Sequence, residues 1–418
     1  MAISLSKFFP KDTEYFYSFP EGQESNFFSN DPPWKEELYA TRPLTCCGDD
    51  IKVVIFSSST NNRAWHLLYD EIKTAKFNRK QIVMLPENIS ADIKGKRRTQ
   101  LIKSALKKAC TPKKLIMAQP FLDADLEDCF QISPSLSVWL NDKNNIPEYI
   151  PSDCYPRRFV TFPNGKALNA ADCVFSLPCV IKVSSSASGD GVLICRKEED
   201  FARAKKKFKS VRQTIFIEEY INYVHNIGIQ FGISFDRRKP IKIIGVNEQI
   251  TTEDGEYMGA IIDRQQRISG VEKIYKLLLD DILPAVRKKG WYGVGGFDVL
   301  IDQSGHFYFI DCNFRITAMT AYMYQIKNHE IKNSVASFTG TFRGSEEDFR
   351  KTILPIAVQS DNKQRIKIIT LSEKDGTYRF NACLFFRQRK NIPKLAKELL
   401  RLGIKSEVLK RFSNFKDF

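Results

Sequence analysis

Two aspartates and an asparagine late in the chain have the types and spacing of a cation site. In GVGGFDVLIDQSGHFYFIDCN, residues 293–313, apolar and polar residues alternate on both sides of a short turn, which predicts two antiparallel strands. That pairing would set Asp298 opposite Asp311, with Asn313 on the same face and Arg315 just beyond. Two carboxylates and an amide oxygen suit a hard cation such as Mg²⁺ that bridges phosphates. The alternative is that the carboxylates are exposed or paired with arginine, and the flanking aromatic residues argue against exposure.

A loop of small residues between two apolar strands has the composition of an anion site. Ser184 to Gly191, SSSASGDG, contains four serines and two glycines, which lets backbone N–H groups approach an anion closely. Lys182 lies two residues before the loop, where its ammonium would reach the same anion. A flexible hairpin with a solvated lysine is an equally good interpretation of this segment alone. The loop matches neither GxxxxGK[ST] nor GxGxxG.

A third segment, TIFIEEYI at residues 214–221, is an apolar strand that ends on two carboxylates and is followed by His225. In isolation the simpler interpretation of such carboxylates is that they are solvated at a strand end.

The elements that must position these segments fall into four regions. Residues 1–50 lack sustained periodicity and are interpreted as an irregular N-terminal arm. Strand and helix patterns alternate over residues 51–140, which predicts an α/β domain with a parallel sheet. A proline-rich stretch then opens a domain at residues 141–335. The family resemblance given below implies a lid subdomain within it, at about 165–217. Residues 336–418 predict a small, basic α/β extension.

Composition and charge narrow the class of protein. The 418 residues are 43% hydrophobic and contain no apolar run long enough for a membrane span, so a soluble protein without a membrane partner is expected. The N-terminus does not resemble a secretory signal, and ten cysteines without metal spacing predict reduced thiols and a cytoplasmic location. The net charge of +15 is concentrated at residues 72–114 and after residue 340. Such surfaces attract polyanions, but few aromatic residues are interleaved, so nucleic-acid binding is disfavoured.

Taken in order, these segments resemble the ATP-grasp superfamily of carboxylate–amine ligases over roughly residues 140–330. The resemblance implies an ATP-grasp fold, α/β overall and α+β in the grasp, with a pre-ATP-grasp α/β domain before it and a small extension after it. It also implies ATP and Mg²⁺ as cofactors. Four motifs carry it: a first lysine in NDKNNIPEYIP, a second lysine before a small-residue lid, an acidic hinge strand, and the metal signature.

The resemblance assigns a role to each motif. The metal would be held by Asp298, Asp311 and Asn313, and Arg315 and Lys182 would act on the reacting groups. The nucleotide would contact Lys143, Lys182, Ser185, Ser186, Ser188, Gly189, Gly191, Glu218, Glu219, Tyr220, Ile221 and His225. Substrate contacts would come from Glu248 and Gln249, within a run at residues 245–263, and from Arg264 and Arg267 shortly after it. For the two arginines a solvated loop is equally well supported.

Three departures from the family pattern limit what is carried over. The middle metal ligand is usually Glu and here is Asp311, which is one methylene shorter. His225 and Asn226 stand where a ribose-binding carboxylate is usual, so the ribose contact is open. Gly296 replaces an arginine found two residues before the first metal ligand in D-alanine ligases, which disfavours a small amino acid held in that way.

Within the superfamily the layout is similar to that of pheganomycin-type peptide ligases and butirosin-type ligases that load amino acids onto carrier proteins. The function implied is ATP-dependent activation of an amino-acid or peptide carboxylate as an acyl phosphate, followed by attack of an amine. Transfer to the thiol of an acidic carrier protein and a non-catalytic ATP-binding scaffold stay open as alternatives. Relatives of this fold are often dimers, so a homodimer is one expected assembly.

Overall fold

The computed structural model describes most of the chain, and its description is limited to the following residues: 4–11, 15–18, 41–48, 51–57, 63–74, 79–86, 89, 96–109, 115–117, 124–171, 176–186, 189–264, 268–328, 334–358 and 365–414. Within that part, no helix is long and apolar enough to cross a membrane.

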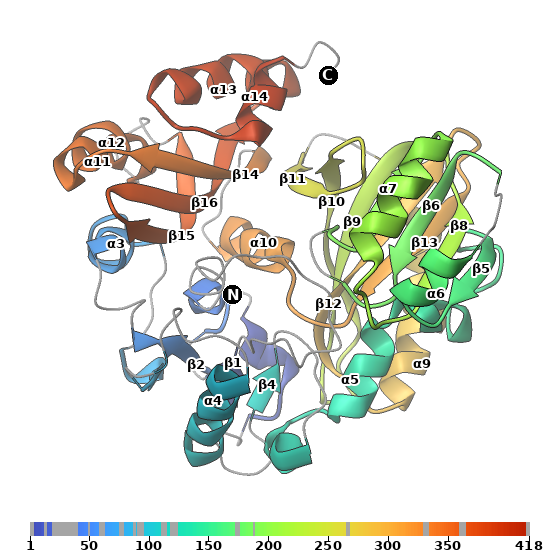
Figure 1. Ribbon diagram of the computed structural model, residues 1–418. Helices are drawn as coiled ribbons and strands as arrows, with labels where there is room; N and C mark the ends of the chain where they lie inside the picture. Colours follow the sequence, from blue (N-terminus) through green and yellow to red (C-terminus); the bar gives the residue numbers. More distant parts are fainter. Residues whose placement is uncertain are drawn as a thin grey trace.

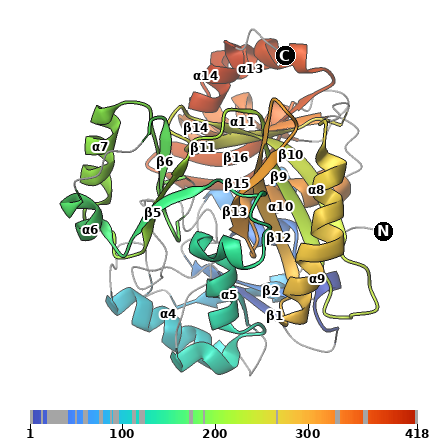
Figure 2. The same cartoon turned by 90° about the vertical axis from the view of Figure 1, so that its right-hand side faces the viewer.

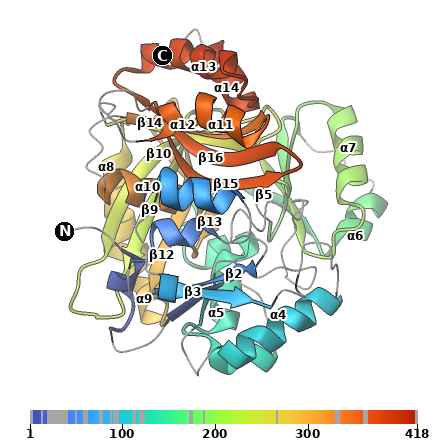
Figure 3. The same cartoon turned by 90° about the vertical axis from the view of Figure 1, so that its left-hand side faces the viewer.

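The N-terminal region contains a four-stranded sheet in which every pairing is parallel, with strand order β3-β2-β1-β4. Its strands are β1 (Tyr15–Ser18), β2 (Ile51–Phe56), β3 (Ile82–Leu85) and β4 (Leu115–Met117). The parallel α/β sheet predicted for residues 51–140 is therefore confirmed. The interpretation of residues 1–50 as an irregular arm is wrong for Tyr15–Ser18, because β1 lies in the middle of this sheet. Its four residues are too short a run to show strand periodicity. Figure 3 shows the sheet beside α4 (Lys96–Ala109).

A second sheet of eight strands runs through the rest of the molecule in the order β13-β12-β9-β10-β11-β14-β16-β15, with every pairing antiparallel. In chain order its strands are β9 (Tyr223–Ile233), β10 (Lys242–Thr251), β11 (Tyr257–Ile262), β12 (Gly293–Asp302), β13 (Phe307–Asn313), β14 (Ser334–Arg343), β15 (Ile366–Lys374) and β16 (Thr377–Phe386). The last three strands belong to the predicted C-terminal extension, so the boundary predicted at residue 335 crosses a continuous sheet (Figure 1).

Helices cover both faces of this large sheet. On one face the side chains of Ile227, Ile229, Phe297 and Phe309 are 0% exposed. Figure 2 shows α8 and α9 on the side of the large sheet that faces away from the sheet of β5 to β8, which is described below. On the other face α10 packs against β11, β14 and β16 through a separate apolar cluster. The helices of this half are α8 (Val271–Leu277), α9 (Leu283–Lys288), α10 (Ala318–Asn328), α11 (Glu346–Thr352), α12 (Leu354–Ala357), α13 (Ile392–Arg401) and α14 (Glu407–Ser413).

The third sheet, which we call the lid sheet, is antiparallel and has the order β5-β8-β6-β7. It consists of β5 (Arg158–Phe162), β6 (Cys179–Val183), β7 (Val192–Cys195) and β8 (Ile215–Glu219), with helices α6 (Gly165–Ala170) and α7 (Glu198–Phe208). The two helices pack on the face that carries Ile181 and Ile217, through Leu168 and Phe208. The opposite face, which carries Lys182 and Glu218, is left for contacts with β13 (Figure 2). In chain order α3 (Arg63–His66) lies between β2 and β3, and α5 (Pro134–Asn141) lies between the first sheet and the lid sheet.

Candidate active site

The two strands predicted to carry the cation site pair as expected. In the register of β12 with β13, Asp298 lies directly opposite Asp311 and Gly296 opposite Asn313. Residues that face each other across antiparallel strands point to the same side, so both carboxylates and the amide share one face of the large sheet. The predicted placement of Asp298 against Asp311 is confirmed.

Opposing influences act on the charge of these carboxylates. Burial and the neighbouring charge of Asp311 together raise the pKa of Asp298 to about 7, while a hydrogen bond from Gln249 and the charges of Lys143 and Arg315 act in the opposite direction. The carboxylate of Asp311 forms an ion pair with the ammonium of Lys143, at a distance of 3.0 Å. No group of three or more His, Cys, Asp or Glu side chains gathers in the described residues, and the set here is two carboxylates and an amide. Oxygen ligands of this kind fit a hard divalent cation.

A β-bulge shapes this end of the site. The register shifts between Asp298 and Val299, which leaves Ile310 as the extra residue on β13. An extra residue in a bulge does not take part in the ladder, so its carbonyl group is available to other donors. The ammonium of Lys182, from the lid sheet, donates a hydrogen bond of 3.3 Å to the Ile310 carbonyl. The bulge therefore connects the lid lysine to the strand that carries Asp311.

The two lysines both lie in the site, and both are buried. Lys182 forms an ion pair with Glu218, and both side chains are about 6% exposed. Lys182 stands opposite Phe216 and Val180 opposite Glu218, so the two charged residues are diagonal neighbours on one face of the lid sheet. Lys143 begins a short 3-10 helix and is 4% exposed, and its backbone N–H donates to the Ser184 carbonyl at the start of the loop.

Arg158 holds this arrangement together from β5. Its guanidinium donates to the carbonyl groups of Lys143 and Asn144 at 2.9 and 3.2 Å, and it lies 4.0 Å from the centre of the Phe216 ring. Burial lowers the pKa of Arg158, with the charge of Glu218 acting in the opposite direction. Arg158 was not predicted from the sequence, because one arginine at the start of a strand carries no signal of its own.

The loop of small residues is partly described. Ser185 and Ser186 are buried, and Gly189 has φ of +82°, a conformation that favours glycine. A Cβ atom at Gly191 would lie 2.4 Å from the Ser186 side chain, so the loop closes tightly on itself. Ser188 lies outside the described residues.

The predicted hinge residues, Glu218 to Ile221, do not all lie on the face of the lid sheet that carries Lys182. Glu218 shares a face with Lys182, whereas the carboxylate of Glu219 accepts a hydrogen bond of 2.8 Å from the backbone N–H of Arg157. Tyr220 lies beneath the guanidinium of Arg196, and Ile221 is buried. The predicted nucleotide contact of Glu219 therefore competes with its bond to Arg157, the residue before β5.

The register of β9 corrects the expectation for His225. His225 stands opposite Ile301, on the buried face, whereas Asn226 and Gly228 alternate onto the face of Asp298. A shift of one residue along a strand exchanges faces, so the sequence alone did not decide between the neighbours His225 and Asn226.

Of the predicted substrate residues, the structure places only some in the site. Gln249 on β10 donates a hydrogen bond of 2.5 Å to the carboxylate of Asp298, which brings it into the site. Glu248 points to the opposite face and pairs with Arg389 at 2.6 Å, so the site does not include its side chain. Arg264 is exposed, and Arg267 lies outside the described residues.

Buried amides extend the site along the same face. Gly228 lies between Asp298 and Asn247 in the paired strands, and a Cβ atom at Gly228 would lie 2.9 Å from Asn247 and 3.2 Å from Gln249. The glycine thus leaves room for Gln249 to reach across β9 to Asp298. Asn247 is 1% exposed, and neither polar atom of its amide has a hydrogen-bond partner in the described residues. No periodic pattern in the sequence singles out Asn247.

Comparisons with known proteins agree with this geometry. Residues 156–313 match the family model of L-aspartate–L-methionine ligase, ATP grasp. A D-alanine–D-alanine ligase of Geotalea uraniireducens is 28% identical over 156 residues, which are 37% of this chain and 49% of that protein. The small subunit of 2-oxoglutarate carboxylase of Hydrogenobacter thermophilus is 28% identical over 162 residues, which cover 33% of this chain and 30% of that subunit. The matches thus span about half or less of the curated relatives.

Solved structures resemble the chain over nearly its whole length. An L-amino acid ligase from Bacillus licheniformis superimposes with a TM-score of 0.56 at 13% identity, covering 95% of this chain and 99% of the other. Biotin carboxylase from Campylobacter jejuni gives a TM-score of 0.58 at 13% identity, covering 96% of each chain. At such identities the likeness shows the fold, an ATP-grasp fold, and residues 156–313 are similar in sequence to an ATP-grasp ligase family.

Proposed function

We propose that the protein is an ATP-dependent carboxylate–amine ligase that joins an amino-acid or peptide carboxylate to an amine and releases ADP and phosphate. The observation that carries this proposal is the meeting of two buried lysines and two opposed aspartates where β13 contacts the lid sheet. The family match to an L-aspartate–L-methionine ligase and the likeness to an L-amino acid ligase support an amino-acid substrate.

In this proposal the two lysines bind the phosphates of ATP. Lys182 and Lys143 now neutralise Glu218 and Asp311, and an arriving polyphosphate competes with these carboxylates for both ammonium groups. The backbone N–H groups of the loop around Gly189 cover the transferred phosphoryl group. The hinge after β8 receives adenine, and Glu218, once released by Lys182, accepts a hydrogen bond from the nucleotide.

Asp298, Asp311 and Asn313 would hold Mg²⁺. When bound, the ion neutralises charge on the phosphoryl group during transfer. Gln249 orients the Asp298 carboxylate for this task through its hydrogen bond.

The proposed reaction depends more on the positioning of the two substrates and ATP than on general acid–base catalysis by the protein. A carboxylate oxygen attacks the γ-phosphorus and the bond to ADP breaks, which gives an acyl phosphate. An amine nitrogen attacks the acyl carbon, phosphate leaves with the bridging oxygen, and the nitrogen gives up a proton to solvent. Arg315, whose charge acts on Asp298, is placed to stabilise the oxyanion, and Asn247 and Gln249 face the substrate side. The closed lid excludes water, which would otherwise hydrolyse the acyl phosphate.

The test is release of ADP by the purified chain with ATP and Mg²⁺, across pools of amino acids, dipeptides and carrier proteins. Substrate-dependent ADP release that is lost in Asp311→Asn supports the ligase and identifies the pool. Release only with a carrier protein would favour the thiol acceptor. ATP binding without release from any pool would favour a scaffold, and failure to bind ATP would contradict the proposal.

A further inference from the structure

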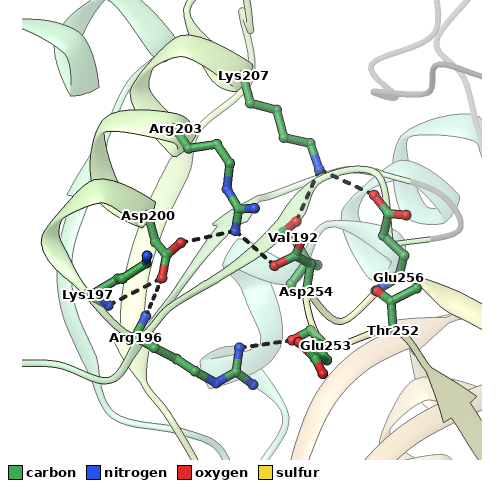
Figure 4. A network of polar contacts seen from close by, with 10 residues as sticks. All are labelled: Val192, Arg196, Lys197, Asp200, Arg203, Lys207, Thr252, Glu253, Asp254 and Glu256. Atoms are coloured by element: carbon green, nitrogen blue, oxygen red, sulfur yellow. Dashed lines mark hydrogen bonds and ion pairs between the residues drawn. The ribbon is translucent and has the colours of Figure 1, made fainter.

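The lid meets the large sheet at a second place, away from the lysines. Helix α7 and the end of β7 face the turn between β10 and β11, residues 252–256, which we call the hairpin turn (Figure 4). The guanidinium of Arg203 lies between two carboxylates, 3.2 Å from Asp200 on its own helix and 2.9 Å from Asp254 on the hairpin turn. Arg203 therefore connects the lid helix to the turn.

Two more basic residues of the lid contact the same turn. The guanidinium of Arg196 donates to the Glu253 carbonyl at 3.1 Å. The ammonium of Lys207 lies 3.7 Å from the Glu256 carboxylate and donates to the Val192 carbonyl at 3.3 Å. The lid surface is thus basic where the turn is acidic, and Figure 4 shows the contacts spread along one edge of α7.

The loop of small residues packs on this turn as well. A Cβ atom at Gly189 would lie 2.7 Å from the Glu256 Cα and 3.1 Å from the Gly255 carbonyl oxygen. The backbone of Gly189 is therefore in close contact with the backbone of the turn. Any outward movement of α7 and β7 would separate this pair of backbones.

The hairpin turn is held by its own hydrogen bonds and by contacts with the C-terminal helix. Within the turn, the backbone N–H of Thr252 donates to the Glu256 carbonyl at 2.8 Å, and the Thr252 carbonyl accepts the N–H of Gly255 at 3.1 Å. Arg411 on α14 donates to the Thr251 carbonyl, and Val408 lies against Gly259. The C-terminal helix therefore supports the hairpin that the lid contacts.

We propose that Arg203 and Asp254 are positioning residues, which hold Gly189–Gly191, the described end of the small-residue loop, over the proposed phosphate site by fixing α7 to the hairpin turn. The inference rests on the proposed ATP-binding role of that loop. It gives the basic C-terminal extension a task inside the molecule, because α14 supports the turn. Since β10 also carries Gln249, which holds Asp298, one hairpin fixes both the lid and a proposed metal ligand.

The solvent exposure of Arg203 and Asp254 sets how strongly their ion pair can hold the lid. Arg203 and Asp254 are 50% and 42% exposed, so the pair is screened by solvent and salt. A single exposed pair changes an equilibrium by about two- to fivefold. The connection therefore suits a lid that must open in every catalytic cycle.

The experiment reverses the charges one at a time and then together in the full chain. The variants are Arg203→Asp, Asp254→Arg and the double variant, with Glu199→Lys as the matched control. Glu199 is 78% exposed on the same helix and pairs only loosely with Lys197, at 3.9 Å. Hydrogen–deuterium exchange of peptides covering residues 184–191 and 198–208 is measured without ligand, and ATP affinity is measured by calorimetry with Mg²⁺.

Each single reversal is expected to speed exchange in both peptides and weaken ATP binding by about two- to fivefold, and the double variant should recover most of both. The control should leave both unchanged, and added salt should narrow the difference between the parent chain and the single variants, because salt screens exposed charges. Unchanged exchange in the single variants, or no recovery in the double variant, would overturn the inference. Hydrogen–deuterium exchange needs neither ATP nor turnover. This measurement therefore still tests the Arg203–Asp254 inference if the ligase proposal fails.

Discussion

Lys182 and Glu218 form a buried ion pair on one face of the lid sheet, diagonal to each other on β6 and β8. Removing one partner of such a pair leaves an uncompensated buried charge, which costs about 3–5 kcal/mol of stability. Lys182→Met is therefore expected to destabilise the chain strongly, and Lys182→Met combined with Glu218→Gln to be more stable than Lys182→Met alone. Thermal denaturation of the three proteins checks this. Equal stability of the single and double variants would contradict the coupling.

Gly189 meets two constraints at once, a positive φ and close contact with the hairpin turn. Gly189→Ala is expected to weaken ATP binding about tenfold or more, since strain of about 1–3 kcal/mol falls on the loop. Calorimetric titration with ATP and Mg²⁺ measures this. The control is Gly305→Ala, which also has positive φ, of +81°, but has nothing within 4 Å of its Cβ position. Equal loss of ATP affinity in both variants would count against a specific role for Gly189.

Lys367 on β15 is 7% exposed, and burial lowers its pKa to about 8, with the Cys383 thiol acting in the opposite direction. Between pH 8 and about 10.4 the unfolded lysine binds more protons than the folded one, so stability rises with pH across that window and is lost as pH falls through 8. Lys367→Met should remove this pH dependence and raise the melting temperature at pH 7. Melting curves from pH 7 to 10 test it, with the exposed Lys374→Met as control. A lower melting temperature for Lys367→Met at pH 7 would contradict the prediction.

Asn247 keeps a buried amide beside the carboxylates without a partner in the described residues. An unpaired buried polar group costs about 1–3 kcal/mol, so Asn247→Leu is expected to raise the melting temperature of the ligand-free protein. The same variant should lose turnover with its substrates while keeping ATP affinity, because the amide lies on the substrate side in the proposed function. A fall in melting temperature would indicate that an ordered water already satisfies the amide.

The pairing of Asp298 with Asp311 was well predicted from the sequence because the pattern that indicates it is local. Two strands joined by a short turn have a nearly fixed pairing, so the alternation around Asp298 and Asp311 sufficed. Residues on strands joined by long connections were placed less well. Choosing between His225 and Asn226, or between Glu248 and Gln249, requires the register of β9 with β12 and β10, which pairing across the whole domain decides.

Other features left no local pattern at all. The strand Tyr15–Ser18 becomes a strand through pairing with β2 and β4, both distant in the chain. The bulge that frees the Ile310 carbonyl depends on the pairing of β12 with both of its neighbours. The roles predicted for Lys143, Lys182 and the hinge residues, and the pheganomycin-type or butirosin-type subfamily, stay predictions.

The eight-stranded sheet has a practical consequence for anyone who shortens this protein. A chain that stops at residue 335 would keep the ATP-grasp segment 156–313 but lose nearly all of β14 and the whole of β15 and β16. The edge of β11 would then present unpaired N–H and C=O groups, and α10 would expose the apolar side chains that now pack on the missing strands. Open edges of this kind recruit other chains. Expression of residues 1–335 alone would therefore yield aggregates rather than a smaller folded protein.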